Sequence, residues 1–313
     1  MEASTNNPFS GIVLIAQQEK EIYFRSSGHK DQDHKVKIKK DDRFVVGSIS
    51  KQFTAVMVLQ QYEKGNLKLS DPISKYLSSI PQNWDTITIH QLLTHTHGIV
   101  RLEQALAFKP GSKFMYSQHG YELLAQILEK VTRKSFAEQS RILFQKCKMK
   151  STCHPSFLKQ ADLVVCFTGQ ENGTLLTETK SLEGFPAAGC FISSASDLIK
   201  WNQLLFGGQL LNDSTLKLMT SPQKNAIRDH PVFSLTNYGY GITISKANGL
   251  EQVGQTGFAD GFASMNFYFP ATKTSVVVLE NIAYDPGDLK KTFYYHTRIL
   301  DYLRKDLEQD AIK

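Results

Sequence analysis

The residues with the clearest chemical potential follow the pattern Ser-x-x-Lys, which sets a hydroxyl and an amine one helical turn apart. The pattern begins at Ser27, Ser48, Ser156, Ser214 and Ser221. An N-capping serine followed by a surface lysine is common, so the pattern alone means little. Only the copy at Ser48 and Lys51 leads straight into a long apolar stretch, residues 53–59, which is typical of a buried helix. We therefore place the candidate chemistry there.

The spacing of Ser48 and Lys51 has a chemical consequence. On a helix, residues three apart lie on one face, so the lysine amine can reach the serine hydroxyl. The dipole at a helix N-terminus and burial both disfavour a charged ammonium, and both lower the pKa of Lys51. A neutral amine can accept the hydroxyl proton, so the pair predicts a nucleophile and its base.

Two later segments add groups suited to the same chemistry. Tyr116, in the run Tyr-Ser-Gln, stands just before a helical pattern, where its phenol could project into a cleft. The run Gln255-Thr256-Gly257 sits between two predicted strands. A glycine in a strand lets another chain or a substrate approach closely, so we expect a substrate to lie along this strand edge.

Taken in order, these three segments resemble the signature of penicillin-binding proteins and serine β-lactamases. The sequence is most similar to class C β-lactamases, D-alanyl-D-alanine carboxypeptidases and related esterases. The similarity runs from about residue 9 to about residue 285, with supporting stretches at residues 9–16, 71–77, 91–98, 188–198 and 238–241. It implies an α/β (α+β) fold of the β-lactamase/transpeptidase type, with an antiparallel sheet flanked by helices and an inserted, mainly helical lobe.

The resemblance also implies roles for individual residues. Ser48 would be the nucleophile, Lys51 its base, and Tyr116 a proton relay to the leaving group. The backbone N–H groups of Ser48 and Phe258 would form an oxyanion hole. Which of Lys51 and Tyr116 takes the first proton stays open, because such a pair titrates as one system. The implied substrate-binding residues are Gln118, Gln255, Thr256 and Gly257.

Two of these positions depart from the family pattern. Gln118 stands where the family usually has Asn, and Gln255 stands where it usually has Lys or His. A neutral amide gives up the charge-assisted hydrogen bond that helps to hold a substrate carboxylate. This favours ester or D-amino-acid amide substrates over β-lactams. The alternatives are a class C-like β-lactamase, or a catalytically impaired binding or sensor module.

Hydrophobic periodicity places these motifs in one domain over residues 1–313. Alternating apolar runs predict a hairpin at 11–17 and 21–25 and strands at 238–245, 262–269 and 274–280. Helical periodicity covers 124–131 and 289–303, and Ser135 and Ser194 begin capping patterns. Strands at both ends imply a discontinuous α/β lobe, about 8–46 and 185–313, around a helical lobe of about 47–184.

The composition argues against several other classes of protein. The net charge of +6 comes partly from residues 29–40, which carry no aromatic or arginine-rich readers, so we expect no nucleic-acid partner. The longest apolar runs are too short to cross a membrane, where about 18 to 20 residues are needed. The expected partner is a small-molecule or peptide substrate, and the oligomeric state stays open.

Metal and disulfide chemistry are also not expected. His90, His95 and His97 lie close in sequence but lack a carboxylate or thiolate at ligand spacing, so we expect no metal and no other cofactor. The four cysteines, which show no paired metal spacing, are expected to be buried free thiols. The N-terminus lacks the features of a signal peptide. The expected compartment is therefore periplasmic or secreted if a leader was removed, and cytoplasmic otherwise.

Overall fold

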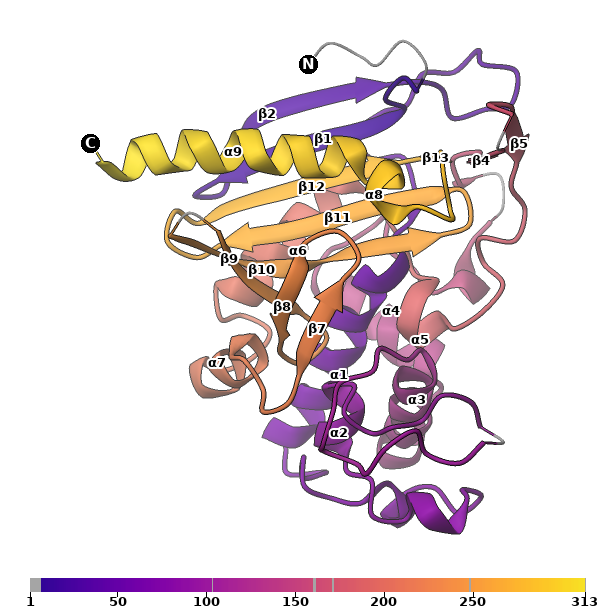
Figure 1. The fold of residues 1–313 in the computed structure, drawn as a ribbon, viewed down its shortest axis with the longest axis vertical. Coiled ribbons are helices and arrows are strands. Elements are labelled where there is room, and N and C mark those ends of the chain that lie inside the picture. The colour runs from indigo at the N-terminus through magenta and orange to yellow at the C-terminus, as the bar shows by residue number, and fades with distance from the viewer. Residues whose placement is uncertain (1–6, 103, 160–161, 171, 248, 313) are drawn as a thin grey trace.

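The largest element is an antiparallel sheet built from both ends of the chain. The computed structural model describes residues 7–312 except 103, 160–161, 171 and 248. Within them the strand order is β2-β1-β12-β11-β10-β9-β8-β7 (Figure 1). The strands are β1 Gly11–Gln17, β2 Lys20–Ser27, β7 Ile227–His230, β8 Ser234–Tyr238, β9 Thr243–Ala247, β10 Leu250–Ala259, β11 Phe262–Phe269 and β12 Thr274–Glu280.

Helices cover both faces of this sheet, because side chains alternate along its central strands. In β1, Ile12 and Leu14 join the core on the side of α6, Ala195–Phe206, while Val13 and Ile15 pack on the side of α9, Tyr294–Ile312. Figure 1 shows α9 crossing the front of the sheet with α6 behind it. The sheet is therefore the middle layer of the fold, and both of its faces are apolar.

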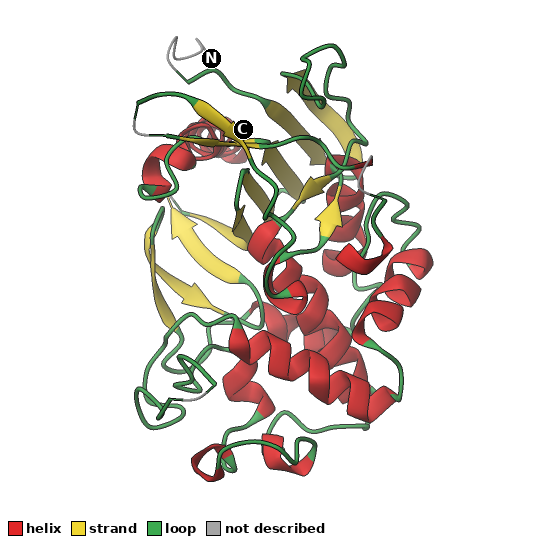
Figure 2. Cartoon of the chain, turned by 90° about the vertical axis from the view of Figure 1, so that its right-hand side faces the viewer, coloured by secondary structure: helices red, strands yellow, loops and turns green. Residues whose placement is uncertain are grey.

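The helices within residues 50–220, apart from α6, gather at one end of the sheet (Figure 2). The α-helices are α1 Ser50–Glu63, α2 Ile89–Leu93, α3 His119–Thr132, α4 Phe136–Lys146, α5 Pro186–Gly189 and α7 Asp213–Thr220. Short 3₁₀ turns are η1 Gly47–Ile49, η2 Ile73–Lys75, η3 Gln82–Trp84 and η4 Pro155–Phe157. No helix among the described residues is long and apolar enough to cross a membrane.

Two small sheets connect the helical end to the rest of the chain. Strand β3, Phe44–Val45, pairs with β6, Ile192–Ser193, on either side of the helical segment in sequence. Strand β13, Ile282–Ala283, pairs with β4, Phe167–Gly169, which pairs in turn with β5, Leu175–Thr177. Strands β4 and β5 fall within the expected helical lobe, yet β4 pairs with β13 of the C-terminal part. The division into two lobes stays a prediction.

Most predicted elements are confirmed, and one is wrong. The hairpin and the strands at 262–269 and 274–280 are present, and Ser135 and Ser194 cap α4 and α6 by accepting from backbone N–H groups. The predicted single strand 238–245 is instead the end of β8, a turn at residues 239–242 and the start of β9. Gly241 has φ +70°, and a side chain there would lie 2.6 Å from the backbone oxygen of Lys51. The chain turns at this point because it packs against α1.

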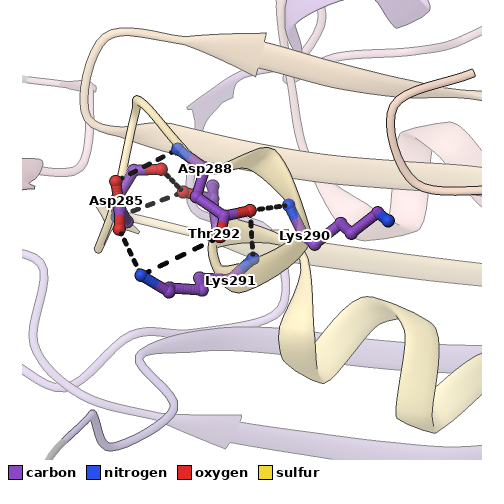
Figure 3. Close-up of polar contacts among 5 residues, drawn as sticks. All are labelled: Asp285, Asp288, Lys290, Lys291 and Thr292. Carbon is purple, nitrogen blue, oxygen red and sulfur yellow. Dashed lines mark hydrogen bonds and ion pairs between the residues drawn. The ribbon is translucent and has the colours of Figure 1, made fainter.

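The C-terminal helical region begins with a network of polar contacts (Figure 3). The Asp288 side chain accepts from the backbone N–H groups of Lys290 and Lys291, which caps α8, Leu289–Thr292. The Lys291 ammonium also lies 3.1 Å from the Asp285 carboxylate. The sequence predicted one helix over residues 289–303, and the structure adds a break at Phe293 before the long helix α9.

The helix α1 is buried on nearly every side, as its apolar sequence predicted. Its Phe53 ring makes edge-on contacts with Phe144, Phe191 and Trp201, at centroid distances of 5.0, 5.5 and 4.7 Å. Aromatic pairs in this geometry stabilise by more than their buried area alone. The cluster therefore fixes the start of α1, where the candidate nucleophile lies.

Removing this ring should destabilise the fold strongly. We expect Phe53→Ala to lower the free energy of unfolding by about 3–5 kcal/mol, measured by urea denaturation, because a cavity would remain among the other rings. The control is Phe157→Ala, since Phe157 is 46% exposed. That variant should lose less than about 1 kcal/mol. Equal losses in the two variants would contradict the importance of the cluster.

Candidate active site

The turn η1 and the first turn of α1 set Ser48 beside Lys51. Ser48 is partly exposed, whereas the side chain of Lys51 is wholly buried. The Lys51 Nζ lies 3.3 Å from the Ser48 Oγ, on the shared helix face that the spacing predicted. The partly open hydroxyl and the hidden amine suit an attacking group and its proton acceptor.

The other contacts of Lys51 fix the direction of its amine. The Nζ lies 2.5 Å from the Gln118 Oε1 and 2.7 Å from the Ala188 backbone oxygen. A carbonyl oxygen only accepts hydrogen bonds, so two N–H groups point at these two atoms. The third direction faces Ser48, where an ammonium would donate a hydrogen bond and a neutral amine would accept one. Burial, above all, lowers the pKa of Lys51, as the sequence predicted.

The Tyr116 ring lies close to two basic side chains. The Lys51 Nζ is 4.6 Å from its centroid, and the Arg228 guanidinium carbon is 4.2 Å away. The phenol oxygen is buried and makes no hydrogen bond of standard geometry. Burial raises the pKa of Tyr116, but the charges of Lys51 and Arg228, together with interactions with Ser48 and Lys51, lower it by more, so this pKa lies below its ordinary value.

Two glycines allow η1 to approach strand β10. Gly47 has φ +54°, and a side chain there would collide with the backbone nitrogen of Phe258. A side chain at Gly257 would collide with the backbone oxygen of Val46 and with Ser264. The sequence interpretation gave the space at Gly257 to a substrate, whereas the structure gives it to the Val46 backbone. The close approach sets the Phe258 amide beside the Ser48 turn.

Gln255 is wholly buried, and both the oxygen and the nitrogen of its amide form hydrogen bonds. Its Oε1 accepts from the Arg228 guanidinium at 3.2 Å and from the Thr243 hydroxyl at 3.0 Å. Its Nε2 donates to the Tyr238 hydroxyl at 3.2 Å. A substrate could bind the Gln255 oxygen only by displacing one of these donors. Arg228, on the short strand β7, belongs to none of the motifs, and nothing in the sequence pattern marked it.

Thr256 lies beside a buried histidine that the sequence did not single out. The His230 Nε2 lies 3.1 Å from the Thr256 Oγ1. Because the His230 Nδ1 accepts from the Val232 and Phe233 backbone N–H groups, its proton is assigned to Nε2, which donates to Thr256. Burial, with a smaller contribution from Arg228, lowers the pKa of His230 to about 2. His230 therefore holds the Thr256 side chain as a neutral donor.

The three histidines near residue 95 have separate neighbours. The His95 ring packs 4.4 Å from the Tyr116 ring and accepts from the Ser117 N–H. The His90 Nδ1 lies 2.8 Å from the Tyr240 hydroxyl, and the His97 Nδ1 accepts from the Ile99 N–H. In the part of the chain that the structure describes, no three His, Cys, Asp or Glu side chains form a metal site. The four cysteines are free, and all but Cys153 are buried.

Glu122 is a further residue near the site that the sequence reading missed. Its carboxylate accepts from the Ala187 N–H at 2.8 Å, next to the Ala188 carbonyl that binds Lys51. Burial raises the pKa of Glu122 to about 6, although the Ala187 hydrogen bond and the Lys51 charge oppose the shift. Glu122 thus joins α3 to the segment that supplies an acceptor to Lys51.

Comparison with known proteins decides the family, because the Beta-lactamase family model matches residues 7–300. The chain belongs to the beta-lactamase family. "Putative penicillin-binding protein PbpX" of Bacillus subtilis is 26% identical over 294 residues, which cover 88% of this chain and 71% of that protein. The family is that of the serine β-lactamases and penicillin-binding proteins, as the ordered motifs indicated.

Solved structures share the fold of this beta-lactamase family member. The octameric penicillin-binding protein homologue from Pyrococcus abyssi has a TM-score of 0.79 and 24% identity, covering 93% of this chain and 74% of that chain. D-amino acid amidase from Ochrobactrum anthropi, complexed with L-phenylalanine amide, has a TM-score of 0.83 and 20% identity, covering 95% and 94%. The fold is therefore of the β-lactamase/transpeptidase type, as the sequence predicted.

A side chain at Gly47 should disturb this site. We expect Gly47→Ala to destabilise the protein by at least about 2 kcal/mol more than Gly65→Ala, because added atoms in a packed region force a backbone shift. Gly65 is the matched control, since it also has positive φ, +72°, but a side chain there would meet nothing within 4 Å. Its loss should be the conformational cost alone, about 1–2 kcal/mol. Thermal and urea unfolding measure both; equal losses would contradict the close approach.

Glu122 should make the stability depend on pH. Its folded-state pKa of about 6 lies above the ordinary 4.5, so its contribution is fully present below pH 4.5 and is lost as the pH rises through 6. The loss should be about 2 kcal/mol, at about 1.4 kcal/mol per pKa unit. Urea unfolding between pH 4 and pH 7 should show this fall in wild type relative to Glu122→Gln. Parallel curves for the two proteins would refute the raised pKa.

Proposed function

We propose that this chain is a serine hydrolase that works through an acyl-enzyme on Ser48. The observation that carries the proposal is the coordination of Lys51. Two carbonyl oxygens take two directions of the buried amine, and the third faces the Ser48 hydroxyl at 3.3 Å. A serine activated by an adjacent base is the usual starting point of acyl transfer.

The other neighbours of Ser48 suit the remaining steps. As the Ser48 oxygen attacks an acyl carbon, its proton passes to the Lys51–Tyr116 pair. The backbone N–H groups of Ser48 and Phe258 stabilise the oxyanion, at about 2.7 to 4 kcal/mol for each donor. Tyr116 returns the proton to the departing alcohol or amine. Water then hydrolyses the ester on Ser48 and frees the enzyme.

Ester or D-amino-acid amide substrates are the class that we propose. Support comes from the fold shared with a D-amino acid amidase and with a D-stereospecific amidohydrolase from Streptomyces, which has a TM-score of 0.75 and 23% identity. The neutral Gln255 argued against β-lactams. Arg228 weakens that argument, because it sets a cation against the same amide.

Mutation of Ser48 should abolish covalent labelling. Wild type should gain one adduct mass with a fluorophosphonate and with a p-nitrophenyl ester, and Ser48→Ala should gain none, because the Ser48 hydroxyl is the one beside the buried Lys51 amine. Intact-mass spectrometry measures the adducts, and p-nitrophenol release follows turnover. The matched control is Ser214→Ala, which alters another Ser-x-x-Lys copy at an exposed position and should label normally.

The same experiment separates the alternatives. Labelling of a folded Ser48→Ala protein at the wild-type rate would refute the proposal. Stable Ser48 adducts without product release would instead support a binding or sensor module. The rates of product release from a fluorescent penicillin and from a D-phenylalanine amide, measured side by side, distinguish a β-lactamase from an amidase. Circular dichroism confirms that each variant is folded.

A further inference from the structure

Arg228 is the charged residue that the sequence motifs did not include. It lies on β7, at the edge of the large sheet, and its guanidinium carbon is 4.2 Å from the Tyr116 ring centroid. None of the ion pairs among the described residues involves Arg228. An arginine that is partly buried without a carboxylate partner is unusual, because burying a charge is costly unless it is paired. The Arg228 charge therefore acts on a group other than a carboxylate.

Gln255 explains how Arg228 is held at this place. The Gln255 oxygen accepts from both Arg228 and Thr243, and its nitrogen donates to Tyr238, so the amide cannot turn without losing hydrogen bonds. A lysine or protonated histidine at position 255 would set a second cation against the guanidinium. The neutral amide at 255 and the arginine at 228 thus belong together.

We propose that Arg228, held by Gln255, is a positioning residue that stabilises the ionised Tyr116 phenol, so that Tyr116 takes the proton of Ser48. The inference rests on the proposed function and extends it by naming the base. The proton moves from the Ser48 oxygen to the phenolate as the serine oxygen bonds to the acyl carbon. When the bond to the leaving group breaks, the same proton passes from Tyr116 to that group.

The charges around the phenol support this assignment. His95 packs on Tyr116 but stays neutral, because burial holds its pKa well below the ordinary value. Burial likewise holds the pKa values of Tyr121 and Tyr238 well above theirs, so both phenols stay protonated. The charges that face Tyr116 among the described residues are therefore those of Lys51 and Arg228.

Lys51 fits the role of a cation beside the phenolate. It already donates to the carbonyl oxygens of Gln118 and Ala188, and an ammonium has a third N–H for Ser48. Burial is the largest influence on the pKa of Lys51 and lowers it, and Arg228 adds a smaller effect in the same direction, whereas an ionised Tyr116 opposes both and favours the ammonium. Glu122, which interacts with Lys51 and has a pKa raised to about 6 by burial, adds a negative charge above that pH.

The pH profile of acylation tests the role of Arg228. The substrate is a neutral p-nitrophenyl ester, so a contact with a substrate carboxylate plays no part. We expect the acidic limb of the profile to move at least half a pH unit higher in Arg228→Gln, because the phenolate loses one of its two cations. Arg228→Lys, which keeps the charge, should recover most of the shift. An acidic limb that stays in place in a folded Arg228→Gln enzyme overturns the proposal.

A second variant neutralises the guanidinium without removing it. Gln255→Glu has nearly the same shape and sets a carboxylate against Arg228, so its acidic limb should also move higher. It keeps the proposal testable if Arg228→Gln does not fold. A merely structural role for Arg228 predicts no such shift. A rise in KM confined to carboxylate-bearing esters, with an unmoved pH profile, would show that Arg228 binds substrate and would overturn the proposal.

A measurement without catalysis distinguishes this inference from the proposed function. In the Ser48→Ala background, ¹³C NMR of ζ-labelled tyrosine follows the phenols, and Tyr116→Phe identifies the Tyr116 signal. The pH midpoint at which the Tyr116 signal titrates should rise in Arg228→Gln and return toward the wild-type value in Arg228→Lys. An unchanged midpoint refutes the inference even in an active enzyme, and the expected rise supports it even if no substrate is turned over.

Discussion

The burial of the Lys51 amine is the constraint on which the rest of the site depends. An amine without solvent is costly unless its hydrogen-bonding directions are satisfied, and Gln118 and Ala188 satisfy two of them. Helix α1 is buried on nearly every side, which keeps solvent away from the amine, and the aromatic contacts of Phe53 fix its first turns. The third direction stays with Ser48, so the requirement that stabilises the lysine also sets the geometry for proton transfer.

Segments far apart in the sequence meet around this amine, and each brings its own support. Gln118 stands at the start of α3, and Glu122, one turn later, holds the Ala187 N–H next to the Ala188 acceptor. The turn at Gly241 packs on the Lys51 backbone, which places strands β8 and β9 against α1. The sheet and the helical end are thus held together at the residues that handle the proton, so a change in this packing would reach the chemistry directly.

Much of this arrangement could be predicted from the sequence, because the informative patterns are local. The alternation of apolar and polar residues predicted β11 and β12 with their observed ends, and the Ser-x-x-Lys spacing predicted the contact of Lys51 with Ser48. Arg228 could not be found in this way. It reaches Tyr116 through the register of β7 on β8, where it pairs with Thr236, and a slip of one residue would turn it to the other face. Glu122 was hidden for a similar reason, since its partner Ala187 is distant in sequence.

The two glutamines that depart from the family pattern have one explanation in common. Gln118 offers its amide oxygen to Lys51, and Gln255 offers its amide oxygen to Arg228. These are the two basic side chains that lie within 5 Å of the centre of the Tyr116 ring. A neutral oxygen can hold a cation without cancelling its charge, whereas a carboxylate would neutralise it. Both amides therefore leave positive charge near the Tyr116 phenol. Gln118 and Gln255, which the sequence interpretation linked to altered substrate recognition, are equally well explained as residues that favour loss of the phenol proton.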